Sequence, residues 1–144
     1  MGVLLVRHAE AGDRHRWEGP DEERPVSQEG RAQAEALTAA LAGYEIGRIL
    51  SSPYLRCTQT VEPLAAARRL PVEPSDDLAE GWGPVALERG RSLLEGDAHI
   101  VLCTHGDVVE EVLDGLGVGR KEETEKGATW VLGPGEARCL PAPA

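Results

Sequence analysis

The sequence contains no phenylalanine, and aromatic residues make up only 3% of its 144 residues. Val, Leu and Ala must therefore fill the core, and a hydrophobic content of 41% is typical of one soluble globular domain. No apolar run approaches the roughly 20 residues that a membrane helix needs. The first residues show no basic segment followed by a long apolar stretch, so no signal peptide is evident. We expect a cytoplasmic protein without a membrane partner.

Cysteine is also scarce, and its pattern limits the chemistry. The three cysteines, Cys57, Cys103 and Cys139, lie far apart and are odd in number. An odd number excludes complete pairing in disulfides and is typical of a reducing compartment. We expect Cys57 and Cys103 to be small buried apolar residues. The spacings CxxC and HExxH are absent, so the sequence predicts no metal site and no cofactor.

Positive charge is in deficit. Lys and Arg total 15 against 25 Asp and Glu, which gives a formal net charge of -10. Such a surface repels phosphate backbones, so we expect no nucleic acid partner. The charged stretches at Glu110–Glu111 and Lys121–Lys126 are interpreted as solvated faces. The bias toward Ala, Arg, Glu and Gly indicates a GC-rich bacterial genome.

Apolar runs alternate with helical patterns along the chain. Strands are predicted at 3–6, 46–51, 99–104 and 129–132, with a possible short strand at 71–73. One helix begins after the N-cap Ser27 and ends at Gly43 in a left-handed conformation. Further helices are predicted at 56–70, 85–94 and 107–116, the first kinked or broken at Pro63. This alternation predicts an α/β fold: a single three-layer α/β/α domain with a largely parallel central sheet, spanning 1–139, and a disordered tail at 140–144.

Histidines and arginines follow the predicted strands. Arg7 and His8 end the first strand, Arg56 comes shortly after the second, and His105 follows the strand at 99–104. Ligands of open α/β sheets bind beyond the carboxyl ends of the strands, so these side chains should share one crevice. Guanidinium groups donate paired hydrogen bonds to phosphoryl oxygens. The sequence therefore predicts a phosphoryl site in an otherwise acidic protein.

Segments around these residues match the motifs of a known family. They are, in order, 5–10 (LVRHAE), 21–30 (DEERPVSQEG), 51–60 (SSPYLRCTQT) and 104–106 (THG). Together they resemble the motifs of the histidine phosphatase superfamily, which is also called phosphoglycerate mutase-like. In length and motifs the chain is most similar to SixA-type phosphohistidine phosphatases. It also resembles the phosphatase domain fused to some mycobacterial MutT-type hydrolases.

The resemblance implies a role for each matching residue. His8 would be the nucleophile that takes the phosphoryl group, and Arg7, Arg56 and His105 would bind its oxygens. Water would then release phosphate without a metal ion. Arg24 and Ser52, which stand in two of the matching motifs, are further candidates for substrate binding.

The proton donor for the leaving group is open between two carboxyl groups. Glu80, in the segment 77–83 (DLAEGWG), matches the position of the acid in the superfamily, and Asp107 is the alternative. Trp17 either covers the edge of the first helix or stacks on a substrate base. His15, in the same polar loop, is expected to be exposed.

Superfamily members that enclose small metabolites often carry an inserted cap between the acid and the second histidine. Only 24 positions separate Glu80 from His105 in this sequence, so the resemblance implies a shallow and open pocket. Such a pocket favours a phosphoryl group carried by a large substrate, such as a protein phosphohistidine, over a small retained metabolite. The leading hypothesis is a metal-independent phosphatase acting on phosphohistidine or phosphomonoesters. The alternatives are a phosphate-binding regulatory module with little turnover and a phosphoglycerate mutase-type phosphotransferase.

Overall fold

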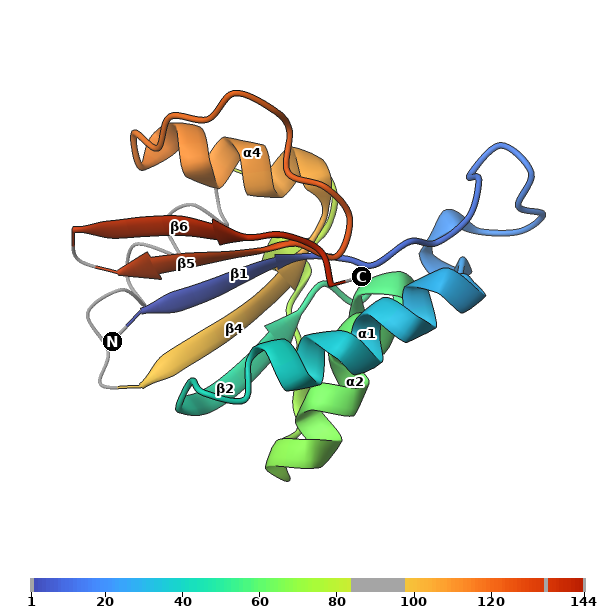
Figure 1. Cartoon of the computed structure of the whole chain (residues 1–144). Coiled ribbons are helices and arrows are strands. Elements are labelled where there is room, and N and C mark those ends of the chain that lie inside the picture. The colour runs from blue at the N-terminus through green and yellow to red at the C-terminus, as the bar shows by residue number, and fades with distance from the viewer. Residues whose placement is uncertain (1, 84–97, 134, 144) are drawn as a thin grey trace.

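A computed structural model describes residues 2–83, 98–133 and 135–143. The described residues form an α/β domain around a six-stranded sheet with the strand order β3-β2-β4-β1-β5-β6 (Figure 1). The strands are β1 (Val3–Arg7), β2 (Ile46–Ser51), β3 (Val72–Pro74), β4 (His99–Thr104), β5 (Thr129–Gly133) and β6 (Glu136–Leu140). The helices are α1 (Gln28–Ala40), α2 (Leu55–Arg68) and α4 (Gly106–Gly115), with short 3-10 helices at Asp21–Glu23 and Asp76–Leu78. The predicted helix at 85–94 lies outside the described residues.

The sheet is parallel on one side and antiparallel on the other. Strand β1 pairs in parallel with β4, and β4 pairs in parallel with β2. Strand β5 runs antiparallel to both β1 and β6. Because β1 lies inside the sheet and is covered on both faces, its residues 3–6 are all buried, as a continuous apolar run predicts.

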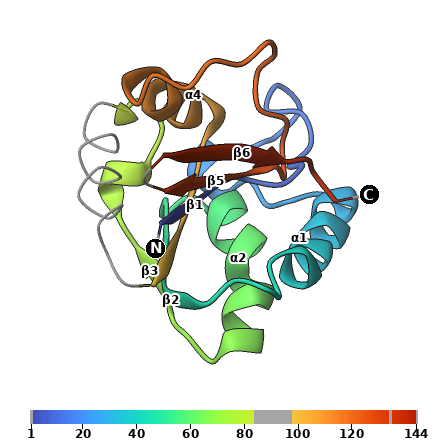
Figure 2. The same cartoon turned by 60° about the vertical axis from the view of Figure 1, so that its left-hand side comes forward.

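Helices cover both faces of the sheet, so the predicted three layers are confirmed (Figures 1 and 2). Leu4 and Val6 of β1 point toward α1 and α2, where they share a core with Leu37, Val61 and Leu64. The alternate residues Val3 and Leu5 face α4 and pack in a second core with buried valines of that helix. The alternation follows from the two-residue period of a strand.

The predicted elements differ from the structure at three points. Gly43 does not adopt a positive φ; the chain leaves α1 through a turn in which the Tyr44 N–H bonds the Leu41 carbonyl. Of the two outcomes predicted for Pro63, a kink or a break, the break is absent: α2 runs through Pro63 without interruption, and buried neighbours such as Leu64 pack the helix against the sheet. Helix α2 ends at Arg68, and the following residue, Arg69, caps it in the left-handed conformation with φ 57°.

The third difference concerns the C-terminal segment. The prediction ended the sheet at 132 and placed Leu140 in a disordered tail, whereas Leu140 is the last residue of β6 and pairs with Thr129. Strand β6 is exposed along most of its length, so it lacks the apolar pattern by which strands are recognised. Beyond it, the Ala142 N–H donates to the Glu125 carboxylate at 2.8 Å.

Candidate active site

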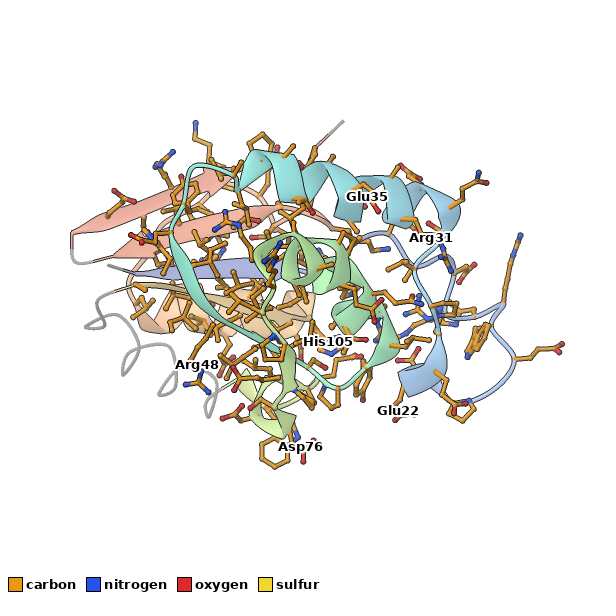
Figure 3. The ribbon with its side chains drawn as sticks, turned by 90° about the horizontal axis from the view of Figure 1, so that it is seen from below. Glu22, Arg31, Glu35, Arg48, Asp76 and His105 are labelled. Carbon is orange, nitrogen blue, oxygen red and sulfur yellow. The ribbon has the colours of Figure 1, made fainter. Side chains whose placement is uncertain are left out.

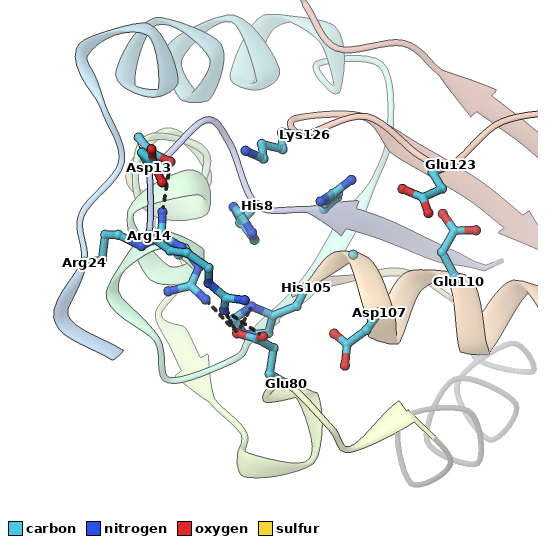
Figure 4. Close-up of a pocket in the computed structure, with 14 residues that line it drawn as sticks. His8, Asp13, Arg14, Arg24, Glu80, His105, Asp107, Glu110, Glu123 and Lys126 are labelled. Atoms are coloured by element: carbon cyan, nitrogen blue, oxygen red, sulfur yellow. Dashed lines mark hydrogen bonds and ion pairs between the residues drawn. The ribbon is translucent and has the colours of Figure 1, made fainter. Parts of the chain in front are cut away.

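The register of the parallel strands brings the predicted site residues together. Arg7 lies opposite Thr104, and Ser51 lies opposite Cys103, so His8, Ser52 and His105 follow three neighbouring strand ends. The His8 N–H donates to Thr104 O at 3.0 Å, and the Ser52 N–H donates to Cys103 O at 2.9 Å. The helices α2 and α4 begin at this edge and add Arg56 and Gly106. A cavity of about 720 Å³ opens here (Figure 4).

His8 lies in the cavity as a neutral imidazole with one free ring nitrogen. Its Nδ1 lies 2.8 Å from the carbonyl oxygen of Ala9, which can only accept, so Nδ1 carries the proton and Nε2 keeps its lone pair. Burial lowers the pKa of His8 to about 3; the bond to Ala9 opposes this shift, and the neighbouring His105 and the guanidinium groups of Arg56 and Arg7 add to it. Nε2 therefore keeps its lone pair over the physiological pH range, which is the state that a histidine nucleophile requires.

Arg7 and Arg56 bring guanidinium groups to the same cavity. Arg56 is almost fully buried, and its Nη1 donates to the backbone carbonyl of Asp21 at 2.9 Å. Arg7 donates from Nη1 to the carbonyl of Thr124. Among the described residues, the buried Nε atoms of Arg7 and Arg56 and the Nδ1 of His105 have no hydrogen-bond partner. His99 Nδ1 and Thr129 Oγ1, outside the cavity, are unpaired as well, so it is the gathering of these donors around one cavity that suits a ligand rich in acceptor oxygens.

His105 lies beside His8, and the Ser52 hydroxyl holds its ring on the side away from the cavity. The two ring centroids are 5.6 Å apart at an angle of 65°. His105 is 2% exposed, and it lies inside the molecule whereas Glu22 and Arg48 lie on the surface (Figure 3). Its Nε2 lies 2.8 Å from the Ser52 hydroxyl, and its Nδ1 lies 3.8 Å from Glu80 Oε2. The two sides of the ring thus have different surroundings.

Asp21, which was not predicted as a site residue, holds the arginines of the pocket. Its Oδ1 accepts from Arg24 at 3.1 Å, and its Oδ2 accepts from Arg56 at 3.0 Å and from Arg14 at 3.4 Å. Partial burial raises the pKa of Asp21, but the hydrogen bonds and charges of Arg24 and Arg56 outweigh it and leave this pKa below its usual value. Asp21 therefore stays ionised among cations that would otherwise repel one another.

The structure separates the two candidate acids. Glu80 lies in the cavity, where it accepts from Arg56 at 2.8 Å and from Arg14 at 3.1 Å (Figure 4). Asp107 also lines the cavity, but its Oδ2 accepts from the Gly81 N–H at 2.9 Å. Asp107 therefore anchors the turn that carries Glu80, and Glu80 is the carboxyl group nearer to His105.

Other predicted residues take varied positions. Arg24 lines the cavity and is anchored to the Ala11 carbonyl at 2.6 Å. Trp17 does not line it; its indole donates to Pro20 O at 2.9 Å. Ser52 is fully buried on the far side of His105 and does not line the cavity either. His15 is exposed, as expected.

The prediction missed two cations of the pocket. Arg14 was not singled out, and Lys126 was interpreted as part of a solvated face, yet both line the cavity. Lys126 is held there because the next residue, Gly127, donates its N–H to the carbonyls of Arg7 and His8. Glu110, interpreted in the same way, is partly exposed at the cavity, and it also accepts from Arg120 and from the Thr124 N–H. The only sequence signal was a basic residue beside a glycine or within a polar loop, which is too common to interpret.

Cys57 and Cys103 are buried, as predicted, and Cys57 Sγ lies 3.6 Å from His105 Nε2. Within the described ranges, no cluster of His, Cys, Asp and Glu side chains has the geometry to hold a metal ion. The helices in the same ranges are too short or too polar to cross a membrane.

Comparison with known proteins places these features in a family. The model of the histidine phosphatase superfamily (branch 1) matches residues 3–93. The 8-oxo-(d)GTP phosphatase of Mycolicibacterium smegmatis is 34% identical in an alignment of 139 positions that covers 90% of this chain and 43% of that protein. The chain thus spans less than half the length of this relative.

Solved structures agree with the match. The protein histidine phosphatase SixA complexed with tungstate superposes with a TM-score of 0.77 at 26% identity, over 91% of this chain and 86% of that one. A mycobacterial glucosyl-3-phosphoglycerate phosphatase in complex with VO3 has a TM-score of 0.74 over 96% of this chain and 95% of that one; at 14% identity it supports the fold alone. The family match covers more than half of the chain, and the chain therefore belongs to the histidine phosphatase superfamily.

Proposed function

We propose that the protein is a phosphatase that hydrolyses phosphohistidine or phosphomonoesters through a phosphohistidine intermediate on His8. The observation that carries this proposal is the state of His8: a buried neutral ring whose Nδ1 is held by Ala9 O and whose Nε2 is free. A histidine nucleophile needs this tautomer. The surrounding donors of Arg7, Arg56 and His105 suit the oxygens of a phosphoryl group.

The reaction runs in two displacements. In the first, Nε2 of His8 forms a bond to phosphorus while the bond from phosphorus to the leaving group breaks, and the leaving group takes a proton from Glu80. In the second, a water oxygen attacks the phosphorus, gives its proton to Glu80, and releases phosphate as the bond from phosphorus to Nε2 breaks. Arg7 and Arg56 neutralise the charge on the phosphoryl oxygens in both steps.

Two relatives suggest different substrates for this site. The similar SixA structure is that of a protein histidine phosphatase, and it was solved with tungstate, a tetrahedral oxyanion like phosphate. The relative from M. smegmatis acts on 8-oxo-(d)GTP. We place phosphohistidine first, because Glu80 is bound by two guanidinium groups and an imidazole leaving group needs less help from an acid than an alkoxide does.

The first experiment compares the wild type with His8→Ala on p-nitrophenyl phosphate, with EDTA present to remove free metal ions. We expect turnover by the wild type and none above background by His8→Ala. His15→Ala is the matched control, because it removes an exposed imidazole outside the cavity. A rapid quench should also trap an acid-labile phosphoenzyme in the wild type. Full activity of His8→Ala would falsify the proposal.

The same preparation tests the two alternatives. A regulatory binding module would bind inorganic phosphate or tungstate in a calorimetric titration and yet hydrolyse neither aryl phosphate nor a phosphohistidine protein. A mutase would isomerise phosphoglycerate faster than it hydrolyses it. Phosphatase activity without isomerisation supports the proposed function against both.

A further inference from the structure

We propose that Ser52 is a positioning residue that keeps the proton of neutral His105 on Nδ1, so that this ring faces the substrate as a hydrogen-bond donor. The inference rests on the proposed function, which needs His105 to bind a phosphoryl oxygen. It goes further in assigning the cause of that role to a buried hydroxyl outside the cavity.

The contacts of Ser52 single out His105 as the acceptor of its hydroxyl proton. Ser52 is fully buried, and its Oγ lies 2.8 Å from His105 Nε2. The N–H of Tyr54 donates to the same Oγ at 3.3 Å and so occupies one of its lone pairs. A serine hydroxyl has one proton to donate. The Cys57 thiol also lies beside this hydroxyl, but sulfur is a weak acceptor, so we assign the proton to the lone pair of Nε2.

The position of Ser52 is fixed by the backbone as well as by its side chain. Its N–H donates to Cys103 O at 2.9 Å, which ties it to strand β4. The ring of Tyr54 packs edge-on against His105 with the centroids 4.6 Å apart. The hydroxyl and the imidazole therefore meet in a rigid and dry environment, where a hydrogen bond is strong and an unpaired group is costly.

The opposite side of the ring shows what this arrangement serves. Nδ1 of His105 is buried, lies 3.8 Å from Glu80 Oε2, and has no hydrogen-bond partner among the described residues. With Nε2 occupied by Ser52, a neutral ring must carry its proton on Nδ1. That N–H is then available to an oxygen of a bound phosphoryl group. His105 presents a donor where His8 presents a lone pair, so the two histidines do not compete as nucleophiles.

Cys57 adds a second contact to the same nitrogen, with its Sγ 3.6 Å from Nε2. A thiol is a weak donor, so it supports the hydroxyl without replacing it. We therefore expect Ser52→Ala to leave Nε2 with a poor partner and to populate the other neutral form, which is protonated on Nε2 and cannot donate from Nδ1.

The test uses the full chain labelled with ¹⁵N-histidine and a long-range ¹H–¹⁵N spectrum at pH 8. In the wild type we expect the neutral ring of His105 to be protonated on Nδ1. We expect Ser52→Ala to shift part of the signal to the form protonated on Nε2. Protonation of His105 on Nε2 in the wild type would overturn the inference. This readout does not depend on turnover, so it separates failure of the inference from failure of the proposed function.

Kinetics give the second arm. Ser52→Ala should lower kcat about tenfold, which is the usual effect of losing one buried hydrogen bond, with a smaller change in KM. Ser52→Cys keeps a weak donor in nearly the same volume and should fall between the wild type and Ser52→Ala under reducing conditions. Ser51→Ala removes a neighbouring buried hydroxyl that contacts the Ser52 carbonyl and the Cys103 thiol but not His105, and it should keep most of the activity. Equal losses in Ser51→Ala and Ser52→Ala, with circular dichroism showing both folded, would contradict a specific role for Ser52.

Discussion

His8 and His105 present opposite ring nitrogens to the same cavity. Nδ1 of His8 is bound to the Ala9 carbonyl, which leaves Nε2 free, whereas Nε2 of His105 is bound to Ser52, which leaves Nδ1 free. The rings are 5.6 Å apart, so one phosphoryl group can meet both. In the proposed reaction, the backbone partner of one ring and the hydroxyl partner of the other would divide two identical side chains into a nucleophile and a donor.

The lowered pKa of His8 predicts a specific loss of stability in acid. The unfolded chain takes up a proton on this residue near pH 6.5, but the folded protein does not until the pH approaches about 3. The unfolded state binds more protons between these values, so stability falls as the pH falls through this window, by about 1.4 kcal/mol per pH unit. Replacing His8 with Asn removes this contribution.

Urea unfolding from pH 7.5 to pH 4 measures the effect as a difference between proteins. As the pH drops below 6.5, the free energy of unfolding should fall less in His8→Asn than in the wild type. His15→Asn is the control, because it removes a histidine outside the cavity. If both variants change the pH dependence of the free energy of unfolding equally, the burial of His8 is not the cause of that dependence.

We predict that position 106 needs a glycine because the Arg7 guanidinium packs against it, and not because of its backbone conformation. A Cβ at this position would lie 2.7 Å from Arg7 Cζ and 2.8 Å from Nη2, and the φ of Gly106 is not positive. Gly106→Ala should leave the free energy of unfolding within about 1 kcal/mol, because alanine favours the helix that begins here. The displaced guanidinium should lower kcat/KM by about 10- to 100-fold, the effect of a shift near 1 Å. Gly43→Ala is the control, since nothing lies within 4 Å of its added Cβ.

Asp21 is expected to strengthen the binding of an anion in the pocket, although Asp21 is itself negatively charged. Asp21→Asn keeps the size of the side chain but weakens its bonds to Arg14, Arg24 and Arg56. If orientation of the arginines dominates, the Kd for tungstate should rise by roughly three- to tenfold, which is the effect of losing one partly exposed charged hydrogen bond. Glu22→Gln removes the same charge from an exposed neighbour. Tighter binding by Asp21→Asn would show that Asp21 only reduces the positive charge of the pocket.

Sequence reasoning identified the residues that follow strand ends and missed those that act through loops. His8, Arg56 and His105 could be predicted because parallel strands deliver their carboxyl ends to one edge, and the register confirms it. Asp21 and Arg14 reach the pocket through the turns of the polar segment after His8. No periodic pattern fixes the path of such a loop.

The placement of Ser52 was hidden for a different reason. Its motif indicated that it belongs to the site, but the motif does not tell whether the hydroxyl faces the cavity or the back of His105. That choice depends on the Tyr54 N–H and on the pairing of β2 with β4, which are contacts between distant segments. Strand β6 was missed because its exposed residues carry no apolar signal.

The assignment of the acid is tested by varying the leaving group. Glu80 lies 3.8 Å from His105 Nδ1 in the cavity, whereas Asp107 supports the Gly81 N–H. A general acid contributes about 10²- to 10⁴-fold when the leaving group is a poor one. Glu80→Gln should therefore slow an alkyl phosphate far more than p-nitrophenyl phosphate or phosphohistidine, whose leaving groups need little protonation.

Asp107→Asn keeps an oxygen that can accept from the Gly81 N–H, so it should slow all three substrates slightly and alike. If Asp107→Asn shows the steep dependence on the leaving group and Glu80→Gln does not, the roles of the two carboxyl groups are exchanged. A dependence in neither variant would indicate that the leaving group departs without an acid, as suits a site whose substrate is a phosphohistidine.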